Sequence, residues 1–380
     1  MRFLLWCTEH SIVKVNDVMK TSNKTSNKAS NKAEGNTADN TVKRARTKTG
    51  DFVPFIALAV IFAFFAITSG GRTVKLDNLL RVLDQSMITI LLGLGMLFVV
   101  AQGSIDLSVG VNLALSGVIG TYVANIAGGW AFIPTCLIVG LVVGIFNGVM
   151  VARFKVNSFM LTISMLIGVR GIVNFIQENL MKATGYGSQN LPGSMLFLGD
   201  ATVRLVIFLV MLVLMAYLFE FTKLGRYSKA IGENETVASN VGVPVTRMKI
   251  LAFSLSGILA GLGGVYAVAK LGSTNQTMGQ FQEMQTAMSI FLGGVLVTGG
   301  ASAKIYKVVL GSISIQLIVN GLAIIGKSES HISQSVQGVI LLVILFVTIV
   351  INSGSLKQLL QRRGHADLAG SRADSSGVSD

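Results

Sequence analysis

Residues 221–249 read FTKLGRYSKAIGENETVASNVGVPVTRMK, a polar segment between two long apolar stretches near 203–220 and 250–270. The segment carries five basic residues against two acidic ones. A bilayer span needs about 20 mostly apolar residues, and both flanking stretches are close to that length. A basic loop between two such spans is expected on the cytoplasmic side of a membrane.

The composition of the whole chain agrees with a membrane protein. Hydrophobic residues make up 51% of the 380 residues and charged residues only 13%, and the mean hydropathy is +0.66. A soluble domain would be about a quarter charged. The net charge of +13 does not come with a basic patch interleaved with aromatic residues, so no nucleic-acid partner is expected. The two cysteines and three histidines are scattered, which predicts no metal site and no disulfide.

The hydrophobic runs predict an all-α polytopic membrane protein with about ten transmembrane helices in a compact bundle. The expected spans lie near 53–70, 79–100, 108–127, 130–152, 158–177, 203–220, 250–270, 284–299, 306–326 and 333–352. The stretch 284–299 could instead be a shorter re-entrant segment. An even number of spans places both termini on one side, and the basic loops make that side cytoplasmic.

The two ends of the chain are expected to lie outside this transmembrane domain, residues 51–352. Residues 1–50 contain a TSNK repeat and predict a disordered, basic cytoplasmic tail. Residues 353–380 predict a polar cytoplasmic tail. Basic residues near the first span also favour contact with anionic membrane lipid. Whether Met1 or Met19 is the start, and what the repeat does, are left open.

Glycine is frequent, at 42 residues, and is often placed with helical spacing. Gly140, Gly144 and Gly148 recur every four residues, as do Gly257 and Gly261. Small residues with this spacing let helix backbones approach closely in lipid. The pattern therefore predicts tight helix packing.

Charged residues inside such a bundle are costly and therefore informative. The segment AQGSIDLSVGVNLALSG (101–117) places Asp106 between two spans, where Asp106 or Ser108 could cap the following helix at its cytoplasmic end or line a polar pathway. Arg170 either reaches the membrane interface or hydrogen-bonds solute or protein carbonyls. The candidate residues for a translocation pathway or gate are Ser104, Asp106, Ser108, Asn112, Arg170 and Asn174.

A phosphate-loop pattern, GxxxxGK[ST], occurs at residues 321–328 but in the wrong setting. Phosphate binding by this motif requires a strand before the loop and a helix after it, whereas here it ends an apolar span. No ATP or Mg²⁺ site is therefore expected in this chain. An integral-membrane enzyme would need a nucleophile–base or metal constellation, and none is visible, so we expect no catalytic residues.

Within the loop 221–249, a short helix is expected from Glu233 to Val241. Gly232 and Gly242 bound it, and Pro244 prevents it from continuing. We expect Val237, Ala238 and Val241 to share one face, with the small Ala238 seated in a cleft of a partner protein.

Four segments carry a resemblance to a known family. They are GSIDLSVG (103–110), FMLTISMLIGVRG (159–171), AIGENETVASNVGVPVTRMKILAFSLSGILAGLGG (230–264) and IFLGGVLVTGGASAKIYKVVLG (290–311). In this order they resemble the permease subunit of ribose-type ABC sugar importers, within the inner membrane components of binding-protein-dependent transport systems. Ser104 replaces a usual glycine, Ile163-Ser164 stands where Leu-Gly is typical, and the loop 301–304 is less glycine-rich than usual. The resemblance covers about residues 53–352.

The resemblance implies a pore-forming subunit of the bacterial plasma (inner) membrane that translocates a ribose-like monosaccharide. It implies a pair of permeases, two cytoplasmic ABC ATPase subunits that bind ATP and Mg²⁺, and an extracytoplasmic sugar-binding protein. The loop between spans 6 and 7 would be the coupling helix region. The expected coupling residues are Gly232, Glu233, Asn234, Val237, Ala238, Val241, Gly242 and Arg247.

The alternative is a secondary, ion-coupled transporter of a small polar solute. Such carriers often place a coupling carboxylate at mid-membrane. Asp106 is the main candidate for one, apart from Glu178 and Glu283 near span ends. The sequence leaves the solute open among pentoses, hexoses, a furanosyl signalling sugar and nucleosides. It also leaves open whether the permease forms a homodimer or a heterodimer.

Overall fold

The computed structural model describes residues 52–184 and 188–326, together with residues 332, 334–340, 342, 343 and 346. Both expected tails and most of the expected span 333–352 lie outside the described residues. The chain divides into residues 1–53 and 54–380, and the bundle described here belongs to the second unit. Over the described residues the secondary structure is helical, apart from an isolated bridge between Asn190 and Ser273.

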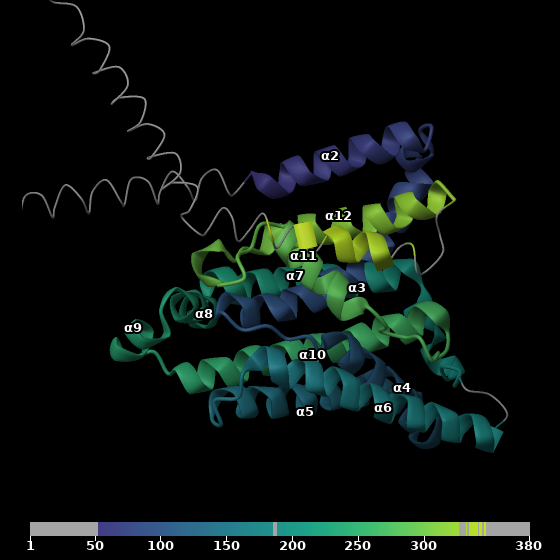
Figure 1. Ribbon diagram of the computed structural model, residues 1–380. Helices are drawn as coiled ribbons and strands as arrows, with labels where there is room; N and C mark the ends of the chain where they lie inside the picture. Colours follow the sequence, from purple (N-terminus) through teal and green to yellow (C-terminus); the bar gives the residue numbers. More distant parts are fainter. Residues whose placement is uncertain are drawn as a thin grey trace, which may run out of the picture. The chain divides into compact units, whose positions relative to one another are not determined.

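Figure 1 shows the long helices running roughly parallel or antiparallel to one another. The α-helices are α2 (Val53–Thr68), α3 (Leu76–Ala101), α4 (Val109–Ala127), α5 (Phe132–Ala152), α6 (Ser158–Thr184), α7 (Ala201–Phe221), α8 (Lys223–Glu233), α9 (Glu235–Asn240), α10 (Val245–Leu271), α11 (Gln282–Leu292) and α12 (Ile305–Ile324). Short 3₁₀ helices are η1 (Arg72–Val74), η2 (Gly129–Ala131), η3 (Gly193–Gly199) and η4 (Gly300–Ser302).

Among the described residues, seven helices are long and apolar enough to cross a membrane: α3, α4, α5 with η2, α6, α7, α10 and α12. Each coincides with an expected span, because an apolar run of bilayer length has few other stable conformations in lipid. Helix α2 is shorter, at 16 residues. The described part of the chain therefore supports a polytopic helical membrane protein but does not confirm a count of ten spans.

The stretch expected near 284–299 does not form one long helix. Helix α11 has 11 residues, and its length of roughly 17 Å is about half of the hydrocarbon core of a bilayer. The chain then turns at Gly293 and Gly294, where Gly294 adopts a φ of 78° that disfavours other residues. The length of α11 fits the shorter, re-entrant alternative.

Helix α10 lies at the centre of the bundle and packs against α3, α4 and α5. Gly140 and Gly144 of α5 face Gly257 and Gly261 of α10, so the two backbones touch. A Cβ atom added at Gly257 would overlap the carbonyl oxygen of Gly140. The close packing predicted from the glycine spacing is therefore confirmed.

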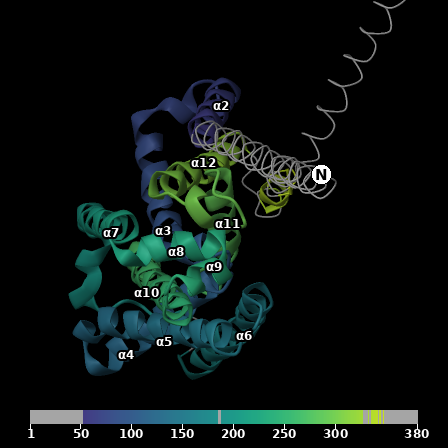
Figure 2. The same ribbon diagram turned by 90° about the vertical axis from the view of Figure 1, so that its left-hand side faces the viewer.

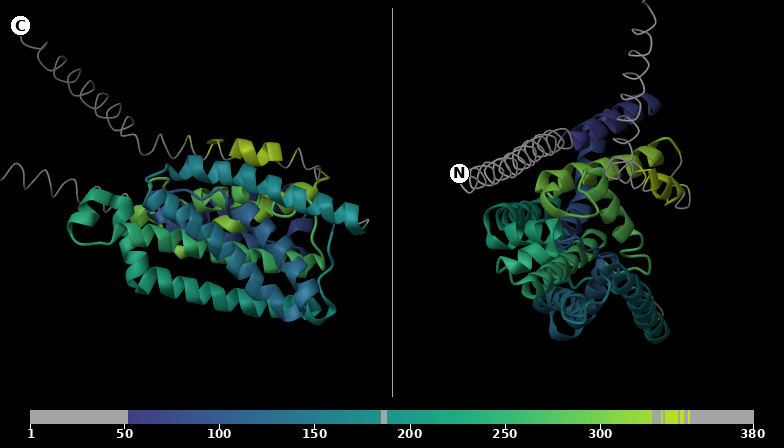
Figure 3. Two further views of the ribbon diagram at one scale, coloured as in Figure 1. Left: turned by 90° about the horizontal axis from the view of Figure 1, so that it is seen from below. Right: turned by 60° about the vertical axis from the view of Figure 1, so that its left-hand side comes forward.

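Helices α6 and α7 lie on opposite sides of the bundle (Figures 2 and 3). Helix α7 is attached by a polar contact as well as by apolar packing. Arg204 of α7 and Lys270 of α10 both pair with Asp84 of α3, at 3.0 Å and 2.5 Å. This cluster joins three helices at the end of the bundle opposite to α8 and α9.

We predict that Gly257→Ala destabilises the bundle, because the new methyl group would overlap backbone atoms of α5. Overpacking of this kind costs about 1–3 kcal/mol. We expect a lower Tm for the detergent-solubilised protein and a smaller monodisperse fraction in size-exclusion chromatography.

The matched control is Gly168→Ala, since Gly168 lies on α6 and a Cβ there meets no atom within 4 Å. Equal Tm values for the two variants would contradict the packing argument.

Candidate functional site

The connection between α3 and α4 is a buried polar turn centred on Asp106, which is only 2% exposed. One carboxylate oxygen, Oδ1, accepts from the backbone N–H of Ser108 at 3.0 Å and from its hydroxyl at 2.6 Å. The other, Oδ2, accepts from the Ser256 hydroxyl at 2.8 Å. Helix α10 begins at Val245, so Ser256 lies about three turns inside it, roughly 16 Å from its start. Asp106 therefore anchors the turn to the interior of the central helix.

The polar contacts continue from this turn into α5. The Ser108 hydroxyl accepts from Nδ2 of Asn147 at 2.9 Å, and Asn112 donates to the carbonyl oxygen of Gly140 at 3.2 Å. Ser108 is the N-cap residue of α4, but its side chain makes no capping hydrogen bond; the Asp106 carboxylate closes the turn instead. In this conformation Asp106, Ser108 and Asn112 are enclosed by helices, as is Ser104. Their role in a pathway or gate stays a prediction.

Arg170 lies on α6 and hydrogen-bonds a protein carbonyl, one of the two expected alternatives. Its Nη1 donates to the carbonyl oxygen of Met278 at 2.9 Å. Gln177, three residues after Asn174 on the same helix, donates from Nε2 to the carbonyl oxygen of Asn275 at 2.9 Å. Both acceptors belong to the connection between α10 and α11, so α6 is held against that connection at two points.

Arg170 and Asn174 also line a cavity of about 350 Å³. The remaining lining residues are Glu178, Gln276, Thr277 and Gln280. The sequence analysis named Glu178 only as a carboxylate of the ion-coupled alternative, and it missed the other three. The signal was the polar run STNQTMGQFQE (273–283), which separates two apolar segments as the loop 221–249 does.

Glu283 lies in the first turn of α11 and is also buried. Its Oε2 atom has no hydrogen-bond partner among the described residues. Gly110 of α4 leaves the space that this carboxylate occupies, because a Cβ atom at Gly110 would overlap Oε2. Gly110, the last residue of the segment 103–110, is therefore needed for close contact between α4 and α11.

The loop 221–249 forms two helices at one end of the bundle (Figure 1). The expected short helix is α9, but it starts later than predicted, because Gly232 and Glu233 still belong to α8. Asn234 separates the two helices and caps α9 by accepting from the Val237 N–H at 3.0 Å. Gly242 follows with a φ of 87°, which lets the chain turn toward α10. The sequence analysis did not predict the preceding helix, α8, which is amphipathic and polar on one face.

The expectation that Ala238 is offered to a partner with Val237 and Val241 is wrong. Ala238 is 3% exposed and packs in a cluster with Ile231, Val243 and Val245 of the same loop. Val237 and Val241, by contrast, are 56% and 75% exposed. Adjacent helical residues differ by about 100° around the axis, so Ala238 points inward while Val237 points outward.

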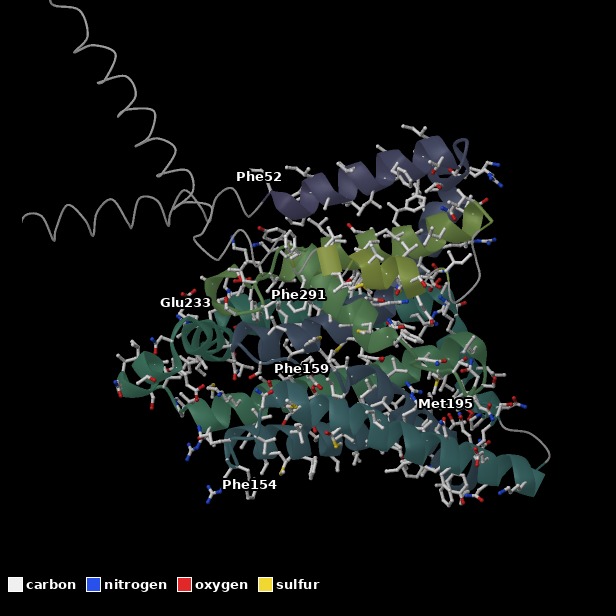
Figure 4. All side chains as sticks on the ribbon, viewed as in Figure 1. Phe52, Phe154, Phe159, Met195, Glu233 and Phe291 are labelled. Carbon is white, nitrogen blue, oxygen red and sulfur yellow. The ribbon has the colours of Figure 1, made fainter. Side chains whose placement is uncertain are left out.

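Several polar contacts attach this loop to the bundle, among them a hydrogen bond from Gln102 at the C-terminal end of α3 to the Ser228 hydroxyl at 2.9 Å. Lys249 of α10 lies 2.6 Å from Glu235 of α9, and its hydrogen bond holds the pKa of the Glu235 carboxyl below its usual value. Glu233, at the end of α8, accepts from the backbone N–H of Ala301 at 2.8 Å. Figure 4 shows Glu233 where α8 meets the segment that follows α11. Gly232 has no side chain to keep Gly300 away, so α8 packs directly on η4.

In the described part of the chain, seven span-length helices surround a buried polar turn, and a basic helical loop lies at one end; this is the architecture of a multi-pass membrane protein. Residues 78–347 match the family described as branched-chain amino acid transport system / permease component, and the chain belongs to this family.

Several ribose import permease proteins are similar to this chain, which confirms the resemblance drawn from its motifs. The protein RbsC of Escherichia coli (strain K12) is 30% identical over 77% of this chain and 91% of its own length. RbsC of Bacillus subtilis (strain 168) is 32% identical over 76% and 90%. The fructose import permease protein FrcC of Rhizobium meliloti is 28% identical over 72% and 78%. No solved structure matches the chain.

We predict that Asp106→Asn is tolerated and that Asp106→Leu is not. The asparagine side-chain oxygen can still accept from the Ser108 N–H and hydroxyl. Its NH2 group can donate to the Ser256 hydroxyl oxygen, because a hydroxyl accepts as well as donates. Leucine would leave several buried polar groups without partners, at a cost of about 1–3 kcal/mol each. We expect a near-normal Tm and solute uptake for the asparagine variant and a low membrane yield for the leucine variant.

Ser256→Ala is a second test variant, because it removes the hydroxyl that donates to Asp106 Oδ2 and leaves both hydrogen bonds from Ser108 intact. Loss of uptake in Asp106→Asn at a normal protein level would show that the negative charge itself is required.

Proposed function

We propose that this chain is the membrane-spanning subunit of an ABC importer that translocates a monosaccharide. The observation that carries the proposal is the alignment with ribose import permease proteins over about nine-tenths of their length. Although the family description names branched-chain amino acids, the similar relatives are import permeases for ribose and fructose. That agreement favours a sugar over an amino acid and over the ion-coupled alternative.

In the proposed orientation, the end of the bundle that carries α8 and α9 faces the cytoplasm. The excess of basic residues in this loop supports that choice, since short cytoplasmic loops of membrane proteins are enriched in Lys and Arg. Both termini would lie on the same side. Apolar side chains on α6 and α7, such as Ile167 and Val213, are exposed and would contact lipid or a second copy of the chain.

The proposed docking surface for the ATPase subunits is the outer face of α9. Val237 and Val241 expose apolar side chains there, beside a surface cavity lined by Glu235, Ser239 and Arg247 among others. ATP and Mg²⁺ would be bound by the ATPase. Gly321, which opens the phosphate-loop pattern, lies inside α12 against the ring of Phe65, which supports the structural reading of that motif.

The contact between Glu233 and Ala301 supplies a route for coupling. Closure of the ATPase pair would displace α8 and α9, and η4 would move with them because α8 packs against it. Residues 293–299 connect α11 to η4, and α11 begins at the connection that Arg170 holds. Rigid elements that shift as units are a common means of switching between two states.

The proposal predicts ATP-dependent uptake of a monosaccharide by proteoliposomes that contain this chain, its ATPase and its sugar-binding protein. The probes are radiolabelled D-ribose, D-xylose, D-allose and D-fructose. Uptake should require the ATPase and the binding protein and should survive collapse of the ion gradients. Uptake without the ATPase that an ionophore abolishes would establish the ion-coupled alternative instead.

For docking, we predict that Val241→Asp lowers copurification of the ATPase by tenfold or more while the Tm stays normal. An exposed apolar side chain contributes little to the fold, but a central interface residue commonly contributes about 1–2 kcal/mol to binding. Copurification on a tagged permease and the Tm are the two measurements.

Glu233→Ala is the matched variant for transmission, because it removes the acceptor of the Ala301 N–H and leaves the outer face of α9 unchanged. We expect the ATPase to stay bound while sugar-stimulated ATP hydrolysis falls. Normal copurification with Val241→Asp would rule out α9 as the docking surface, and normal stimulation with Glu233→Ala would rule out the proposed route.

A further inference from the structure

The cavity beside α6 has one wall on that helix and one on a distant segment of the chain. Arg170, Asn174 and Glu178 are spaced four residues apart and form one stripe along α6. Arg170 lies roughly 18 Å and Glu178 roughly 30 Å from the start of the helix. The cavity therefore extends from mid-membrane toward the end of the bundle opposite to α8 and α9. The facing wall consists of Gln276, Thr277 and Gln280.

The backbone of the facing wall is held in place from both sides. From α6, Arg170 bonds the carbonyl oxygen of Met278 and Gln177 bonds that of Asn275. From the other side, the Thr274 N–H donates to the carbonyl oxygen of Gln189 at 2.9 Å. The Met278 side chain is buried against Gly117 of α4. The polar side chains between these points extend from a fixed backbone.

The lining offers both donors and acceptors at short spacing. Asn174, Gln276 and Gln280 each carry an amide with two donor hydrogens and an acceptor oxygen, and Thr277 adds a hydroxyl. The Arg170 guanidinium has further N–H groups besides the one bonded to Met278, and Glu178 accepts. Each hydroxyl of a sugar both donates and accepts, so adjacent sugar hydroxyls match such a mixed lining.

The charge and aromatic content of the lining and the volume of the cavity indicate which class of solute fits. One positive and one negative side chain balance each other among the lining residues, which favours a neutral solute over an anion. The lining contains no aromatic ring on which a nucleobase could stack. A volume of about 350 Å³ lies at the small end of the range of about 300–1,000 Å³ for small-molecule sites, which suits one sugar ring rather than an oligosaccharide.

We propose that this cavity is the solute site of the permease and that it holds a neutral monosaccharide during translocation. Asn174, Gln276, Thr277 and Gln280 contact the sugar, and Arg170 both contacts it and positions the facing wall. The inference rests on the proposed function and adds to it the residues and the class of solute. Binding is weak, because the cavity is open and a translocation site must also release its solute.

The first test measures occupancy rather than transport. Thr277→Cys is introduced in a Cys7→Ser, Cys136→Ala background, and the complex with its ATPase is placed in nanodiscs, where both faces are accessible. We expect a transported sugar to slow maleimide labelling by about threefold, the factor 1 + [S]/Kd at a sugar concentration of about twice Kd. The control is Gly193→Cys at the exposed start of η3, where a Cβ meets no atom within 4 Å and no protection is expected.

The second test separates solute contact from a structural role. Gln276→Leu and Gln280→Leu change exposed side chains, so the Tm should stay normal. We expect the ratio of D-ribose to D-fructose uptake to change at least about threefold, because leucine cannot hydrogen-bond a sugar hydroxyl and the two sugars present their hydroxyls differently. The control Asn179→Leu, on the face of α6 turned away from the cavity, should leave the ratio unchanged.

The two proposals fail in distinguishable ways. If the wild-type complex transports a sugar that neither protects Thr277→Cys nor shows an altered uptake ratio in the glutamine variants, the cavity is not the solute site. If the wild-type complex transports none of the four sugars, the proposed function fails and the site assignment fails with it. Protection of Thr277→Cys together with a shifted ratio establishes the site.

Discussion

Direct backbone contact between α5 and α10 is the constraint on which the rest of the bundle depends. Apolar side chains gain little by leaving lipid for a helix surface, so membrane helices are held by close packing and by polar contacts between them. Gly140 and Gly257 provide the close packing, and the contact places the neighbouring Ser256 against Asp106. The same helix is held at its two ends by Lys249 and Lys270, each paired with a carboxylate.

The sequence predicted the features that follow from local rules and missed those that depend on tertiary contact. Span-length apolar runs and glycine spacing identify helices and their packing faces, because lipid permits few alternatives. Helix α8 was missed because 11 residues are too few for a stable isolated helix, and the contacts with η4 and α3 that support it are not visible in the sequence. The inward turn of Ala238 depends on the cluster around Ile231, which no spacing rule reveals.

The candidate sites divide in the same way. The Asp106 turn is local enough to be anticipated as a turn, although its bond to Ser256 joins positions 150 residues apart. Only the α6 wall of the cavity could be predicted from the sequence. Arg170 and Asn174 stand out on an apolar helix, whereas the opposite wall lies about a hundred residues later in the chain. Asn147 Oδ1 and Glu283 Oε2 remain unpaired inside the described bundle, at positions where a second conformation could provide partners.

The contact between Glu233 and Ala301 has a thermodynamic consequence. The segment from the α10–α11 connection to η4 touches the Arg170 cavity at one end and α8 at the other. Suppose that this segment has two arrangements and that both the solute and the ATPase bind one of them more tightly. The two binding events are then coupled, and the coupling free energy is the same in both directions, because linkage between two sites is reciprocal. A sugar in the cavity would then change the affinity for the ATPase by the same factor by which the ATPase changes the affinity for the sugar.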